Sequence, residues 1–89
     1  MTINPHEHVA ASVHDRGVVL LHTIDGRLFA SNHTGARIWQ ALERRLPVEA
    51  IAAEISDHYG VSRDTAAADT AQFIIELEQR RLVRRGVGR

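Results

Sequence analysis

The pattern of apolar and polar positions near the start of the chain predicts a small antiparallel sheet. Residues 18–21 form the most apolar run, Val-Val-Leu-Leu, and residues 8–13 alternate between the two faces of an expected strand. Residues 23–26, Thr-Ile-Asp-Gly, are typical of a hairpin turn, because Asp-Gly readily adopts the positive φ angles that such turns need. Residues 27–31 then return as a third strand. Short turns at 14–17 and 23–26 join these strands without a crossover.

Helical spacing of apolar residues begins directly after the third strand. Asn32 is a favourable N-cap for a first helix over about residues 33–44. Pro47 suits the first turn of a second helix over about residues 47–58, and Gly60 is expected to end that helix. The apolar sides of the two helices are Ala36, Ile38, Trp39 and Leu42 in the first and Val48, Ile51, Ala52 and Ile55 in the second.

A longer third helix is predicted after the second. Ser62 is its expected N-cap, and its pattern covers about residues 63–81. Residues 82–83 are expected to pack back on the body, whereas residues 1–7 and 84–89 are expected to be flexible. The expected buried stripe of the third helix is Ala66, Thr70, Phe73, Ile74 and Leu77.

These elements predict an α+β fold, in which a three-stranded antiparallel sheet is followed by three helices that cover one side of it. We expect a single domain over residues 1–89, since 89 residues lie near the lower end of what one core can stabilise. Two short helices, a turn containing Gly60 and a longer third helix also make the arrangement winged-helix-turn-helix-like.

The sequence lacks the residue patterns of catalytic, metal and cofactor sites. It contains no cysteine, and no two of its six histidines stand at the spacing that places both on one helix face. No serine occupies a nucleophile elbow, and no glycine-rich loop could hold a phosphate. We therefore expect a protein that is not an enzyme and uses no metal or cofactor.

The charge distribution argues against nucleic acid as a partner. Residues 80–89 hold five of the eleven arginines and no acid, so the rest of the chain carries six arginines against all eleven acids. The start of the third helix sets Arg63 against Asp64 and Asp69, a poor surface for phosphates. The chain has no apolar run long enough to span a membrane and no secretory signal at its start. We expect a cytoplasmic protein that binds neither nucleic acid nor membrane.

The third strand is the most informative candidate for a binding site. Residues 27–31 contain no proline and only one charge, so nothing in them blocks pairing with a further strand if they lie at the edge of the sheet. A third helix beside that strand would form a groove, and an extended peptide could add there as another strand. A capped or dimeric edge without a peptide is the alternative explanation.

Several blocks of the sequence resemble the PqqD-like proteins, which are RiPP recognition elements. The resemblance covers roughly residues 17–83, and the most specific block is Asn-His-Thr-Gly-Ala-Arg-Ile-Trp at 32–39. Two positions depart from the family pattern: Ser31 stands where a large apolar residue is usual, and Arg81 where glycine is frequent. The other matching blocks are 25–27, 48–51, 59–61, Asp69, Phe73, Ile74, Glu76, Leu77 and 82–83.

The resemblance implies that a leader peptide adds antiparallel to the third strand and lies against the third helix. It leaves open whether the strand face of Leu28 and Ala30 or that of Phe29 meets the peptide. Carried over by position, the peptide-binding residues are Arg27, Leu28, Phe29, Ala30, Ser31, Asp69, Gln72, Phe73 and Glu76.

The resemblance further implies a function in making ribosomal peptide natural products. Stand-alone members of this kind bind precursor leaders in lasso peptide biosynthesis, where a transglutaminase-like cysteine protease removes the leader and an asparagine-synthetase-like cyclase closes the ring. One alternative is the chaperone of pyrroloquinoline quinone biosynthesis, which presents its precursor to a radical SAM enzyme. An alternative of another class is a small winged-helix DNA-binding protein.

Overall fold

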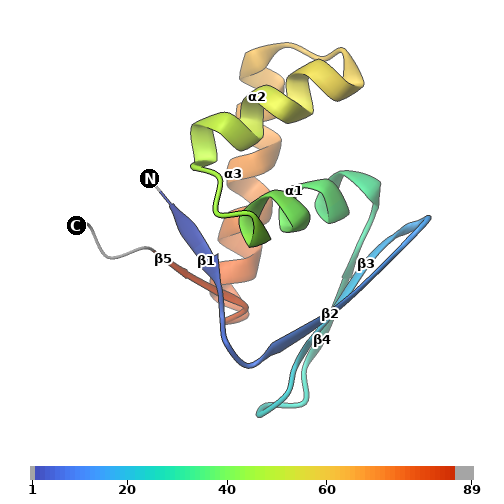
Figure 1. The fold of residues 1–89 in the computed structure, drawn as a ribbon, viewed down its shortest axis with the longest axis vertical. Coiled ribbons are helices and arrows are strands. Elements are labelled where there is room, and N and C mark those ends of the chain that lie inside the picture. Colours follow the sequence, from blue (N-terminus) through green and yellow to red (C-terminus); the bar gives the residue numbers. More distant parts are fainter. Residues whose placement is uncertain (1, 86–89) are drawn as a thin grey trace.

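The structure, a computed structural model, describes residues 2–85 and has the predicted α+β, winged-helix-like fold (Figure 1). The three-stranded sheet lies at the lower right of the view, and the three helices lie above it and to its left. The elements in chain order are β1 (Ile3–Pro5), β2 (Val9–His14), β3 (Gly17–His22), β4 (Leu28–Ser31), α1 (His33–Glu43), α2 (Val48–Tyr59), α3 (Arg63–Gln79) and β5 (Val83–Arg85).

The three-stranded sheet is antiparallel, in the order β2-β3-β4, and β3 is its central strand. Val18 pairs with Ser31 and Leu20 pairs with Phe29, so these four side chains share one face of the sheet. Val18 and Leu20 are fully buried in the core under the helices. The sequence pattern predicted all three strands of this sheet.

A second, two-stranded sheet forms where the sequence suggested loose ends. β1 pairs antiparallel with β5, and Pro5 lies opposite Val83. Ile3 is completely buried in the core, and Leu82 and Val83 are buried as expected. The expectation of flexible ends therefore differs from the structure at residues 3–5 and 84–85, while residue 1 and residues 86–89 lie outside the described part.

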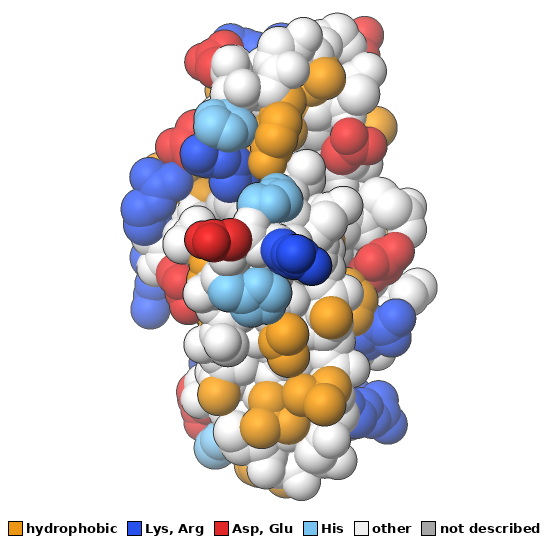
Figure 2. Space-filling view, turned by 90° about the vertical axis from the view of Figure 1, so that its right-hand side faces the viewer, with side chains coloured by type: hydrophobic (Ala, Val, Ile, Leu, Met, Phe, Trp, Pro, Cys, Tyr) orange, Lys and Arg blue, Asp and Glu red, His pale blue; other side chains and the backbone are white. Residues whose placement is uncertain are grey.

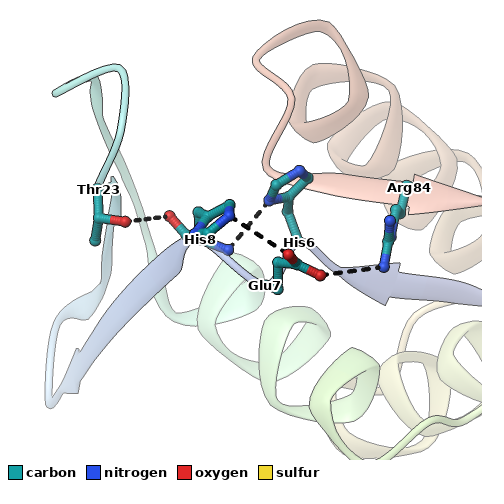
Figure 3. A network of polar contacts seen from close by, with 5 residues as sticks. All are labelled: His6, Glu7, His8, Thr23 and Arg84. Atoms are coloured by element: carbon teal, nitrogen blue, oxygen red, sulfur yellow. Dashed lines mark hydrogen bonds and ion pairs between the residues drawn. The ribbon is translucent and has the colours of Figure 1, made fainter.

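A network of polar contacts joins the two sheets (Figure 3). His8 N–H donates to Nδ1 of His6 at 3.1 Å, and the Thr23 hydroxyl donates to the His8 carbonyl at 3.1 Å. The Glu7 carboxylate lies 3.4 Å from Nε2 of His8 and 3.7 Å from the Arg84 guanidinium. The network ties the turn that precedes β4 to the two-stranded sheet.

The helices begin and end where their capping residues stand. Asn32 Oδ1 accepts a hydrogen bond from Gly35 N–H at 3.0 Å, and Ser62 Oγ accepts one from Thr65 N–H at 3.0 Å. Gly60 ends α2 in the left-handed conformation, with φ 67°. The buried stripe of α3 is the predicted one, and the predicted apolar residues of α1 are all buried.

Gly17 lets the start of β3 approach β4 closely. Its φ is +153°, and a Cβ placed there would collide with the carbonyl oxygen of Ser31. Gly26, in the turn between β3 and β4, also has a positive φ of +73°, but a Cβ there would meet open space. Gly17 is therefore required both by its backbone conformation and by close packing, whereas Gly26 is required by its backbone conformation alone.

We expect Ile3→Ala to lower the free energy of unfolding by about 3 kcal/mol, because it leaves a cavity in the core. Urea unfolding followed by circular dichroism measures this change. Ile24→Ala is the matched control, since the Ile24 side chain is 67% exposed and its truncation should have little effect. Equal, small effects of both substitutions would contradict the burial of β1.

Gly17→Ala should destabilise the fold more than Gly26→Ala. Gly26→Ala costs only about 1 kcal/mol for a left-handed backbone, whereas Gly17→Ala must adopt a φ of +153°, which residues with a side chain rarely adopt, and must also displace the Ser31 carbonyl. Thermal unfolding of the two variants side by side is the measurement. Equal losses would mean that β3 and β4 do not meet closely at this point.

Candidate functional site

β4 lies at the edge of its sheet and has an open side. His22 N–H donates to the Arg27 carbonyl at 2.9 Å, which makes this pair a hydrogen-bonded one. Because such pairs alternate along antiparallel strands, Phe29 bonds toward β3, and the peptide groups of Leu28 and Ala30 point away from β3. Within residues 2–85 no strand pairs with β4 on that side.

The side chains of β4 alternate between the helices and the outer surface. Phe29 and Ser31 are partly buried and face the helices, whereas Leu28 is 69% exposed and Ala30 is exposed on the other face. The ring of Phe29 packs against that of Phe73 in α3, with centroids 6.0 Å apart. The side of Phe29 and Ser31 is therefore the side that borders α3.

Two hollows lie along the boundary between β4 and α3, one lined by Phe73 and the other by Phe29, whose rings are in contact. The first has a volume of about 310 Å³ and is lined by Ser31, Asn32, Thr34, Gly35, Ile38, Asp69, Gln72, Phe73 and Glu76. The second has a volume of about 250 Å³ and is lined by Arg27, Leu28, Phe29, Arg80 and Leu82. Together they form what we call the β4–α3 groove.

The groove contains eight of the nine residues that the sequence assigned to peptide binding. Ala30 is the exception, because its side chain lines neither hollow, although its backbone lies on the open edge. The sequence did not assign Thr34, Gly35 and Ile38 of α1, nor Arg80 and Leu82 after α3. In the sequence Arg80 belongs to the basic end of the chain, and only its place one helical turn beyond Glu76 indicates that it lies at the groove.

Gly35 allows α1 to approach the floor of the groove. A Cβ on Gly35 would collide with the Ser31 side chain and lie 2.9 Å from the Phe73 ring. The small Ser31 side chain, which departs from the family pattern, stands at this close approach. The small residues Ser31 and Gly35 therefore let β4 and α1 meet closely beside the first hollow.

Charged side chains of opposite sign line the two hollows. Asp69 and Glu76 line the first, and Arg27 and Arg80 line the second. The Arg80 guanidinium lies over the Phe29 ring, 4.8 Å from its centroid. The groove could therefore bind an extended segment through backbone hydrogen bonds, apolar contacts and charges.

Histidines come together outside the groove, which their sequence positions did not indicate. The ring of His6 lies 5.5 Å from that of His8 and 5.3 Å from that of His22. Nδ1 of His6 and Nδ1 of His22 each accept a backbone N–H, so these atoms are engaged in the fold. In the described part of the chain, no three His, Asp or Glu side chains are placed to hold a metal ion.

Another hollow of about 470 Å³ lies between the turn joining β2 to β3 and helices α1 and α2. It is lined by His14, Asp15, His33, Arg37 and Tyr59, among others. Figure 2 shows histidine, acidic and arginine side chains at mid-height on this side of the molecule, above a patch of hydrophobic side chains at the level of the sheet. No helix of residues 2–85 is both long and apolar enough to cross a membrane.

Known proteins support a family assignment. The model of the family described as "Coenzyme PQQ synthesis protein D (PqqD)" matches residues 17–83, and none of the curated proteins compared with the chain matches it. The structure "TbiB1 in Complex with the TbiA(beta) Leader Peptide" is 30% identical with a TM-score of 0.87, over 96% of this chain and 99% of that one. The structure "Lasso peptide synthetase B1 complexed with the leader peptide" is 24% identical with a TM-score of 0.84, over 93% and 98% of the two chains, and supports the fold. The chain belongs to the PqqD family.

Proposed function

We propose that this protein binds the leader segment of a ribosomally made precursor peptide as an added strand on β4, in lasso peptide biosynthesis. The observation that carries the proposal is the open edge of β4, where the peptide groups of Leu28 and Ala30 point outward beside α3. A leader-bound structure that is 30% identical over 96% of the chain supports this choice of ligand.

Strand addition divides recognition between the backbone and the side chains of the leader. Leu28 and Ala30 each offer one N–H and one C=O to the incoming strand, and these bonds do not depend on the leader sequence. Alternate leader side chains face the hollows of the β4–α3 groove, where they meet Phe73 and the charged residues. The backbone groups at the edge of β4 therefore supply affinity for the leader, and the side chains of the β4–α3 groove supply selectivity among leader sequences.

The proposed contribution to processing is proximity. A bound leader holds the rest of the precursor near whatever enzyme also binds this protein, which raises its effective concentration. The enzymes that we propose are the transglutaminase-like leader peptidase and the asparagine-synthetase-like cyclase, in the cytoplasm. The protein itself performs no chemistry in this proposal.

A second function within the same family is presentation of a precursor to a radical SAM enzyme during quinone cofactor synthesis. The match of residues 17–83 to the family model described as coenzyme PQQ synthesis protein D favours it. The genes beside this one distinguish the two. A short precursor gene with a peptidase and a cyclase gene supports lasso peptide synthesis, and a radical SAM enzyme gene in their place contradicts it.

We expect Leu28→Pro and Ala30→Pro each to weaken binding of the synthetic leader from the adjacent precursor gene by at least about fivefold. Each proline removes one outward N–H from the edge and leaves the hydrogen bonds between β3 and β4 in place. Fluorescence anisotropy of a labelled leader measures the affinity.

Leu28→Ala is the matched control for the first proline, because it truncates the same side chain and keeps the N–H. Its affinity should stay closer to that of the unaltered protein than the affinity of Leu28→Pro does. Circular dichroism establishes that each variant is folded. Unchanged affinity in both folded proline variants would rule out strand addition at β4.

A further inference from the structure

The β4–α3 groove is polarised, with acidic side chains at one end and basic side chains at the other. Asp69 and Glu76 line the hollow beside Ser31, and Arg27 and Arg80 line the hollow at the start of β4. None of these four forms an ion pair within residues 2–85. Their charges are therefore available to a ligand.

Some charged side chains elsewhere on the surface do form ion pairs. Arg44 lies 2.9 Å from Glu54, and Arg85 lies 2.9 Å from Glu78 on the same helix as the groove acids. Other exposed charges, such as Arg37 and Asp57, also form no ion pair among the described residues, so what distinguishes the groove charges is their separation by sign. Arg80 is held over the Phe29 ring, which keeps its charge at the groove.

The direction of β4 relates these charges to the direction of a bound peptide. β4 runs from Leu28, beside the basic hollow, to Ser31, beside the acidic hollow. A strand added antiparallel to β4 runs the opposite way. Its N-terminal part therefore lies at Asp69 and Glu76, and its C-terminal part lies at Arg80.

The length of the groove sets the spacing of the complementary charges. From Ser31 to Arg27 an extended chain makes four residue-to-residue steps, or about 14 Å. Side chains on the same face of a strand recur at every second residue, so positions i, i+2 and i+4 of the peptide all face α3. The middle position lies nearest the contact between Phe29 and Phe73, where an apolar side chain fits.

We propose that the groove selects an extended segment with a lysine or arginine, then an apolar residue two positions later, then an aspartate or glutamate two positions after that. This inference rests on the proposed strand addition and adds to it the charge order of the bound segment. Charge order gives selectivity because a reversed peptide places like charges together at both ends of the groove.

Selection from a display library of random 14-residue peptides tests the charge order with no assumption about the natural leader. Peptides that bind this protein, and that lose binding to Leu28→Pro, are sequenced. We expect enrichment of Lys or Arg at position i and of Asp or Glu at position i+4. A synthetic peptide with the two charges exchanged should bind about tenfold more weakly.

A charge-exchanged protein provides the reciprocal test. In the double variant Asp69→Lys, Arg80→Glu, both altered side chains are exposed, so the fold should persist, and circular dichroism checks this. Selection with this variant should abolish the enriched order, because the unaltered Glu76 and Arg27 then leave each end of the groove with one charge of each sign. Asp57→Lys, an exposed change on α2 outside the groove, is the control and should leave the order unchanged.

The outcomes separate this inference from the function on which it rests. Peptides that need the Leu28 edge but show no charge order, or show the same order with the charge-exchanged protein, overturn the polarity and leave strand addition standing. Failure to select any peptide that depends on the Leu28 edge overturns both. Loss of the order in the double variant, with the order kept in Asp57→Lys, supports the inference.

Discussion

β4 contacts the helices through only one of its faces, and the rest of the structure depends on this constraint. Phe29 and Ser31 face α1 and α3, and the central strand β3 supports them from the side. Gly17 and Gly35 permit this close approach, because a side chain at either position would collide with Ser31. The strand is thereby held in position while its outer edge keeps its hydrogen-bonding groups available.

An open strand edge is a hazard in most proteins because it pairs with any exposed strand. Here α3 flanks the edge, so an incoming strand must also fit between β4 and the side chains of α3. In the charge order that we propose, Asp69, Glu76 and Arg80 make that fit depend on the peptide sequence. The same geometry that exposes the edge thus restricts what can occupy it.

Local patterns in the sequence predicted most of the fold. The features that the sequence did not predict depend on contacts between residues far apart in the chain. Turn residues and caps such as Asn32, Ser62 and Gly60 act within a few residues, so their effects can be read directly from the chain. The pairing of β1 with β5 joins residues about eighty positions apart through strands of three residues, too short to show a pattern. The face of Phe29 was also undetermined, because Leu28 and Phe29 are both apolar. Arg80 and Leu82 line the groove because α3 packs against the sheet, and no local pattern in the sequence indicates this.

Amide hydrogen exchange along β4 tests the central claim most directly, because it reports each backbone N–H separately. In the free protein, the amides of Phe29 and Ser31 should be protected by β3, and those of Leu28 and Ala30 should exchange freely. Saturation with the leader from the adjacent precursor gene should protect Leu28 and Ala30 as well. Free exchange of these two amides at saturation would contradict the account.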